Sequence, residues 1–453
     1  MENFCIDDQT FSDLNIFSEN PHSIYNLFKG TRTLAARAKL KDMMQHPSHN
    51  VNELILRRDA IRYFYQTAPD LNIRNEELDL IEFYLKSDKR KSKANIIDSV
   101  SDYFTRNSSN DYYIIKTGLK YLIKLTRYLK NFIEVHSTDA TPEFLLTLFG
   151  KIKVIIESGQ LHNSLEIKEK NLKFFEVNKL DHAFRGAEIE NINSLLQLVY
   201  ELDIYENLSM VALKLGLSFP EYDENENMRV NITGLFHPAI KTPVKNDVSF
   251  DKDQNIIFLT GSNMAGKSSL LKSIGLVIYL AHLGFPVPAS EMHTTIFNGL
   301  ITTINLPDNI SQGLSHYYNE VKRVKEVALK LSESNRLFII FDELFRGTNV
   351  KDAFDASLLI ISELSKIEQS AFFISTHIVE LADDIKKFSN ISFRYLETSF
   401  KENKPIFTYL LTNGVSQERI GMTIVLNEGI IDILKKATDK GNTPNTSITL
   451  ETE

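Results

Sequence analysis

The central feature of this chain is the run Gly261-Ser262-Asn263-Met264-Ala265-Gly266-Lys267-Ser268. It is a complete G-x-x-x-x-G-K-[ST] motif that follows the apolar run 256–259 and precedes the helical run 269–274. In this setting, backbone N–H groups of the loop surround phosphates and the next helix points its N-terminus at them. The motif predicts a nucleoside triphosphate site, in which Lys267 neutralises the β and γ oxygens and the Ser268 hydroxyl ligates magnesium. The alternative is a glycine-bearing turn that binds nothing.

Two further apolar runs end in polar residues. Residues 337–341 precede Asp342 and Glu343, and residues 371–376 precede His377. Such runs suit strands buried on both faces, and open α/β sheets bind ligands at the carboxyl ends of their strands. Asp342 is therefore the candidate magnesium partner, and Glu343 is the candidate that orients and deprotonates the attacking water. In the alternative, the two carboxylates only cap the next helix. His377 is either a structural histidine or a sensor of the γ-phosphate.

The sequence pattern changes near residues 220–229. Helical periodicities precede this point, for example at Glu143–Glu157, where Thr141-Pro142 forms the cap and first turn, and at Ile192–Leu215. Strands alternate with helices after it, which is typical of a mainly parallel sheet covered on both faces. The acidic segment 221–227 is interpreted as a linker or exposed loop.

This pattern predicts an α plus α/β protein in three parts. We expect a helical domain at 1–222, a nucleotide-binding domain at 223–440 and a disordered tail at 441–453, which is rich in Asn, Thr, Ser and Glu. The hydrophobic content of 43% is normal for a globular chain of this length.

Four blocks of the chain carry a resemblance to a known family. They are residues 261–268, 281–289 (Ala-His-Leu-Gly-Phe-Pro-Val-Pro-Ala), 342–349 (Asp-Glu-Leu-Phe-Arg-Gly-Thr-Asn) and 375–381 (Ser-Thr-His-Ile-Val-Glu-Leu). In order and spacing they resemble the ATPase domain of the MutS family of DNA mismatch-repair proteins. The resemblance implies a helical core or lever domain followed by a P-loop ATPase domain of the ABC type. Ala265 and Phe345 replace usual glycines and Leu314 stands where an arginine is common, but no departure removes a magnesium ligand or the base.

The resemblance also implies roles for particular residues. Asn263 looks like part of the family's variant of the phosphate loop, and His377 looks like its switch histidine. Ser315, within Asp308–Glu320, would act on the nucleotide of the partner subunit, and His237-Pro238 resembles the place where the family holds the purine. We therefore expect catalysis by Glu343, Lys267, His377 and Ser315, magnesium at Ser268 and Asp342, and ATP against Gly261, Ser262, Asn263, Met264, Ala265, Gly266, Lys267, Ser268, Ser269, His237 and Pro238.

Weaker resemblance continues outside these blocks. Ile6–Ile16 looks like the opening of the family's helical core, and residues 416–422 with Ile430–Ala437 look like the helix-turn-helix by which its ATPase domains pair, which implies a homodimer. Members that read mismatches carry two further domains before the core, one with a Phe-x-Glu wedge. Here Met1 lies only a few residues ahead of the core's opening, and the segment 165–215 is too short for the long clamp. We expect the clamp to be absent or reduced and mismatches not to be read.

Composition and charge limit the partners. The net charge of -8 argues against a protein that mainly coats nucleic acid. The chain has a single cysteine, Cys5, which excludes an internal disulfide and a cysteine-based zinc site. No apolar run is long enough to span a bilayer and the N-terminus is acidic, so we expect a cytoplasmic protein without a membrane partner. Basic residues gather at Lys86–Lys93 and, at helical spacing, at Lys116, Lys120, Lys124, Arg127 and Lys130. They form either a weak DNA site or a solvated helix face.

Together these features predict an enzyme that hydrolyses ATP with Mg²⁺ in a homodimer and moves its helical arms. The resemblance implies a role in DNA repair or recombination. The main alternative is a nucleotide-gated structural dimer that bridges protein or ribosomal partners without recognising DNA. A transporter-type ATPase subunit is a weaker alternative, because the Leu-Ser-Gly-Gly-Gln signature is missing.

Overall fold

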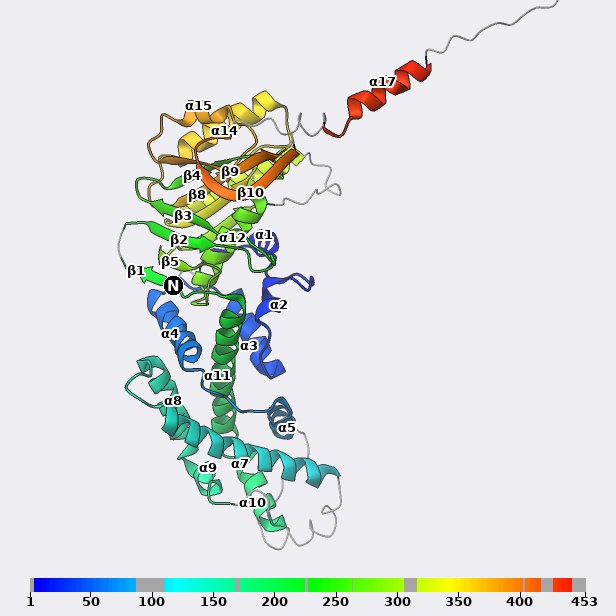
Figure 1. Cartoon of the computed structure of the whole chain (residues 1–453). Coiled ribbons are helices and arrows are strands. Elements are labelled where there is room, and N and C mark those ends of the chain that lie inside the picture. The colour runs from blue at the N-terminus through cyan, green and yellow to red at the C-terminus, as the bar shows by residue number, and fades with distance from the viewer. Residues whose placement is uncertain are drawn as a thin grey trace, which may run out of the picture. The chain divides into compact units, whose positions relative to one another are not determined.

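The computed structural model describes residues 4–86, 110–167, 172–224, 227–262, 264–304, 316–401, 404–416 and 427–441. The chain forms two compact units, and Figure 1 labels most of their elements. Unit 1 comprises Met1–Phe4, Asn15–Tyr222 and Val277–Met292, and unit 2 comprises Cys5–Leu14, Asp223–Leu276 and His293–Glu453. Both helices and sheets are present, which confirms the predicted mixed α and β content.

Unit 1 is mainly helical. Its helices are α2 (Ile24–Phe28), α3 (Leu34–Gln45), α4 (Val51–Thr67), α5 (Asn75–Leu85), α7 (Asn110–His136), α8 (Glu143–Ile156), α9 (Gly159–Ser164), α10 (Phe174–Phe184) and α11 (Ile189–Leu215). Side chains cap two of them: Thr33 accepts a hydrogen bond from the N–H of Ala36, and Asn50 accepts one from the N–H of Glu53. Helix α11 ends where Gly216 adopts a left-handed φ of 64°.

Three sequence predictions for this region need correction. Pro142 is the N-cap of α8 rather than part of its first turn, and α11 begins three residues earlier than Ile192. The linker predicted at 221–227 is wrong for Glu221–Asp223, which form strand β1. The Glu221 carboxylate pairs with Arg58 at 2.7 Å and with Arg62, so distant cations of α4 hold this acidic segment in place.

The main sheet of unit 2 has six strands in the order β10-β9-β4-β8-β7-β6. Five of them, β6 (Gly299–Thr303), β7 (Leu337–Asp342), β8 (Ala371–Ser375), β4 (Ile256–Thr260) and β9 (Ile391–Lys401), pair in parallel. Strand β10 (Lys404–Asn413) pairs antiparallel with β9. The strands predicted at 256–259, 337–341 and 371–376 are confirmed as β4, β7 and β8, with every residue of β4 and β8 buried.

Helices cover both faces of this sheet (Figure 1). Helices α13 (His316–Glu333), α14 (Val350–Leu364) and α15 (Leu381–Ile385) share one buried cluster with Phe258, Ile339 and Phe372. On the other face, α12 (Lys267–Ala281) approaches so closely that a Cβ on Gly275 would lie 3.2 Å from Ile340. Helices α1 (Asp8–Asp13) and α17 (Ile430–Gly441) complete the helices described in unit 2.

A smaller sheet has the order β1-β5-β2-β3. Its strands include β2 (Arg229–Leu235), β3 (Asn246–Asp251) and β5 (Glu291–Thr295), and β2 pairs antiparallel with β3. In the described part of the chain, no helix combines the length and apolar character needed to cross a membrane.

The register of the main sheet brings the predicted site residues together. Asp342 at the end of β7 stands beside Ser375 at the end of β8, and Ser375 stands beside Leu259 of β4. The phosphate loop begins immediately after β4. The three motifs therefore meet at the carboxyl edge of the parallel strands, where such sheets bind ligands.

Candidate nucleotide-binding site

The phosphate loop leads directly from β4 into helix α12, which begins at Lys267. Gly261 and Gly266 have φ angles of 142° and 95°, which side chains rarely adopt. The Lys267 ammonium donates hydrogen bonds to the carbonyls of Gly261 at 2.7 Å and Ser262 at 3.2 Å. Burial lowers the pKa of Lys267, while the negative charges of Glu343 and Asp342 oppose this shift.

The loop carries a buried polar atom that suits a ligand. The Ser262 hydroxyl makes no hydrogen bond to any described residue, and an unpaired buried hydroxyl is costly. Lys267 is directed at loop carbonyls rather than at an acidic side chain, so it is able to turn to a phosphate. Both observations fit the predicted phosphate cradle. Asn263 lies outside the described residues, and the side chain of Met264 is exposed.

The predicted magnesium partners are in contact. The Ser268 hydroxyl donates to one oxygen of Asp342 at 2.6 Å, and the Ser375 hydroxyl donates to the other. A hydroxyl and a carboxylate offer the hard oxygen ligands that Mg²⁺ prefers. The residues present therefore fit a magnesium ion. Sequence reasoning quoted Ser375 only as part of a block, although it holds Asp342 in place.

Glu343 sits in a strained backbone segment immediately after Asp342. Its φ is 56° and that of Phe345 is 60°, both left-handed values that cost on the order of 1–3 kcal/mol in a non-glycine residue. The N–H of Glu343 donates to the carbonyl of Ser375 at 3.0 Å, and the Glu343 carboxylate lies 3.6 Å from the Arg346 guanidinium. Strain of this kind clusters at functional sites because surrounding contacts must maintain it.

A pocket of about 400 Å³ opens beside the loop. Of the residues predicted to bind nucleotide, Ala265, Gly266, Ser269 and His237 line it. The other described ones do not: Pro238, Gly261, Ser262, Met264, Lys267 and Ser268. The other lining residues are Leu235, Phe236, Ile240, Thr242, Pro243, Val244, Asn246, Leu270, Ser273, Leu396 and Tyr409. Burial and the charge of Lys272 lower the pKa of His237, so its imidazole is neutral at pH 7.

Sequence reasoning missed Tyr409. The residue has a φ of 59° in a bulge of β10, where the register shifts between Phe407 and Leu411. Asn246 maintains the bulge by donating to the carbonyl of Tyr409 at 3.0 Å and accepting from the N–H of Leu411 at 2.7 Å. A Cβ on Gly266 would lie 3.0 Å from the Tyr409 ring. No local pattern in β10 indicates this bulge, because it depends on the distant Asn246.

Two predicted catalytic residues have no contact with this cluster to report, for different reasons. His377 follows β8 at the correct edge of the sheet, but its side chain is exposed. Ser315 lies outside the described residues, as do 305–314 and most of the predicted pairing segment 416–422. Their roles stay predictions.

The sequence of this region matches a known family. Residues 257–443 match the family model described as MutS domain V. The chain is 25% identical over 243 residues to the DNA mismatch repair protein MutS of Pseudothermotoga lettingae, and 28% identical over 240 residues to that of Anaplasma phagocytophilum. These matches cover 53% and 52% of this chain and 30% and 29% of the two relatives.

A third relative shows a longer match. The DNA mismatch repair protein MutS of Petrotoga mobilis is 24% identical over 290 residues, which cover 62% of this chain and 35% of that protein. The chain thus spans about a third of the length of these curated relatives.

Proposed function

We propose that this chain, whose residues 257–443 match the family model described as MutS domain V, is a MutS-like ATPase that hydrolyses ATP with Mg²⁺. The observation that carries the proposal is the meeting of Ser268, Asp342 and Glu343 at one edge of the sheet, beside the phosphate loop. A glycine-bearing turn that binds nothing would not require the contact between the Asp342 carboxylate and the Ser268 hydroxyl of α12.

Different residues have separate roles in the proposed hydrolysis. Lys267 and the N–H groups at the start of α12 bind the phosphates, and Ser268 and Asp342 hold Mg²⁺, which when bound neutralises charge on the phosphate oxygens. Glu343 orients the attacking water and takes its proton. The pocket lined by Phe236, His237 and Tyr409 receives the purine, since aromatic faces suit a flat base.

Removal of magnesium tests this proposal. We expect ATP turnover to stop when Mg²⁺ is chelated and to return when it is restored, measured as phosphate release. Asp342→Asn should raise the Mg²⁺ concentration needed for half-maximal turnover, because it removes a charged oxygen ligand. Asp383→Asn, which removes an exposed carboxylate elsewhere in unit 2, is the control. Turnover that continues at full rate in chelator would contradict the proposal.

We further propose that the chain works as a homodimer in the cytoplasm, with a helical core or lever domain at 1–222, an ATPase domain at 223–440 and helical arms that move with the nucleotide state. The resemblance supports this proposal. A role in DNA repair or recombination is supported by the names of the relatives, each a DNA mismatch repair protein. The expectation that these residues do not read a mismatch stays a prediction.

The basic face of α7 gives only limited support for DNA binding. The helix forms as predicted, and Leu119, Leu122 and Leu129 of its apolar face are buried. Lys124, however, pairs with Glu77, and Arg127 donates to the carbonyls of Leu165 and Ile167. Two of its five cations thus stabilise unit 1 itself. This observation weakens the case for DNA binding at this face, and the second candidate function, a nucleotide-gated dimer that bridges protein or ribosomal partners, stays a prediction.

Gel shifts distinguish the two candidates. We expect weak binding to duplex, junction and single strand, with affinity falling about tenfold or more between 50 and 200 mM salt. Reversing the charges of Lys89, Arg90 and Lys91, which lie outside the described residues, should abolish this binding. The matched control reverses three exposed lysines of unit 1, Lys41, Lys151 and Lys153. If the first triple variant binds DNA as the parent does, the basic run does not contribute to the DNA site.

A further inference from the structure

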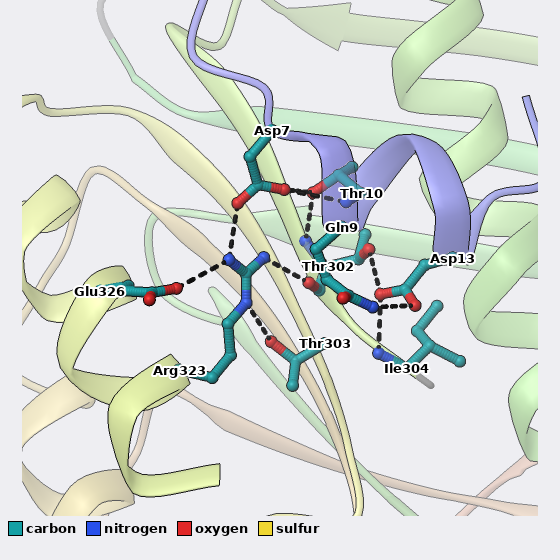
Figure 2. Close-up of polar contacts among 9 residues, drawn as sticks. All are labelled: Asp7, Gln9, Thr10, Asp13, Thr302, Thr303, Ile304, Arg323 and Glu326. Carbon is teal, nitrogen blue, oxygen red and sulfur yellow. Dashed lines mark hydrogen bonds and ion pairs between the residues drawn. The ribbon is translucent and has the colours of Figure 1, made fainter. Parts of the chain in front are cut away.

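A network of polar side chains joins helices α1 and α13 within unit 2 (Figure 2). Arg323 of α13 is at its centre, with a side chain only 8% exposed. Its guanidinium donates to Asp7 at 2.6 Å, to the Thr302 carbonyl at 2.7 Å and to the Thr303 hydroxyl at 3.3 Å. All three guanidinium nitrogens are used, an arrangement that the single ammonium of lysine does not reproduce.

Helix α1 also forms hydrogen bonds with the end of β6. The buried Asp13 accepts hydrogen bonds from the Thr302 hydroxyl at 2.7 Å and from the N–H of Ile304 at 2.9 Å. The Thr10 hydroxyl accepts from the N–H of Thr302 at 3.0 Å. Strand β6 is the last strand of the main sheet, so these contacts satisfy backbone groups that no neighbouring strand pairs.

The network lies next to the residues proposed for hydrolysis. In the parallel pair of β6 and β7, Thr303 stands beside Phe341, the residue before Asp342. Glu320 precedes Arg323 by three residues and so lies on the same side of α13. Its carboxylate, also buried, accepts from the N–H of Gly347 at 3.2 Å. Gly347 belongs to the loop that follows Glu343, so α13 connects this loop to the Arg323 network.

We propose that Arg323 is a positioning residue for ATP hydrolysis, which fixes α13 to α1 and β6 and thereby holds the loop of Glu343 through Glu320. The inference rests on the proposed hydrolysis. A displacement of about 1 Å in a catalytic group costs on the order of a hundredfold in rate, so even a small movement of α13 is consequential.

The charge of the network is maintained at neutral pH. Burial raises the pKa of Asp7, but hydrogen bonds from Arg323 and Thr10 outweigh it and leave the pKa of Asp7 below its usual value. The carboxylate is therefore ionised at neutral pH, and the ion pair weakens only as pH falls below the usual range of an aspartate.

Arg323→Lys and Asp7→Asn test this proposal. Arg323→Lys keeps the charge but loses the three-way contact, and Asp7→Asn keeps the shape of the side chain. We expect each to lower kcat about tenfold while the Kd for ATP stays within about twofold, because the phosphate loop is untouched. Hydrogen exchange of the nucleotide-free chain should become faster at the amides of Ile304 and Gly347.

Two neighbouring variants are the controls. Asp8→Asn removes an exposed carboxylate at the start of α1, next to the N-cap Asp7. Glu326→Gln changes the exposed carboxylate that contacts Arg323 at 3.3 Å. Both should match the parent in kcat and in exchange.

The two readouts separate the possible failures. An unchanged kcat, or unchanged exchange at Gly347, in a folded Arg323→Lys chain overturns the positioning role. A lower melting temperature with unchanged kcat assigns Arg323 to stability alone. A parent chain without ATP turnover overturns the proposed function instead, and exchange at Gly347 then still decides whether Arg323 holds the loop.

Discussion

Glu343→Gln is expected to bind ATP as the parent does and to lose almost all turnover. The substitution keeps the size of the side chain but removes the carboxylate that takes a proton from water. General-base catalysis contributes about a hundred- to ten-thousandfold, so phosphate release should fall by at least a hundredfold. Binding should persist because Lys267, Ser268 and the pocket beside Tyr409 are unchanged. Titration with a fluorescent ATP analogue and a phosphate-release assay measure the two quantities separately.

Two further variants serve as comparisons for Glu343→Gln. Lys267→Ala should lose binding as well as turnover, because it removes the cation that faces the phosphates. Glu363→Gln, an exposed carboxylate of α14, should change neither quantity. A Glu343→Gln chain that hydrolyses ATP at the parent rate would remove Glu343 from the catalytic role.

The sequence was most informative where local pattern and chemistry agree. The apolar runs of β4, β7 and β8, whose strands end at Thr260, Asp342 and Ser375, required no distant contact to be assigned as buried parallel strands. Parallel pairing then places their carboxyl ends at one edge, so the contact between Ser268 and Asp342 followed from the motifs alone.

Features that depend on distant partners could not be predicted. Glu221 looked like part of an exposed acidic linker because its partners, Arg58 and Arg62, lie about 160 residues earlier in the chain. Arg323 was not singled out from the sequence, because its partner Asp7 is 316 residues away. Nothing in local periodicity distinguishes such a residue from a solvated one.

The left-handed conformation of Tyr409 could not be predicted either. The bulge arises because Asn246 of a different sheet binds the backbone at Tyr409 and Leu411, a contact that local sequence does not show. On α7, the sequence predicted the basic face correctly, but it did not show that Lys124 and Arg127 are used within unit 1.

The second large effect concerns assembly. If Ser315 acts on the nucleotide of the partner subunit, Ser315→Ala and Lys267→Ala each inactivate both sites of a homodimer, but they damage different halves of each site. Mixing the two inactive proteins should therefore restore activity. Random exchange at equal amounts makes half of the dimers mixed, and each mixed dimer has one intact site, so about a quarter of the parent turnover should return.

Dilution provides an independent measure of the same property. Turnover per chain should fall as the protein dissociates to monomers, which size-exclusion chromatography with light scattering can follow at the assay concentrations. In the matched control, Ser315→Ala is mixed with the double variant Glu343→Gln, Ser315→Ala. No dimer of these two chains contains an intact Ser315, so no activity should return. If mixing Ser315→Ala with Lys267→Ala also restores nothing, or if monomers hydrolyse ATP as fast as dimers, each chain contains a complete site and Ser315 does not act across the interface.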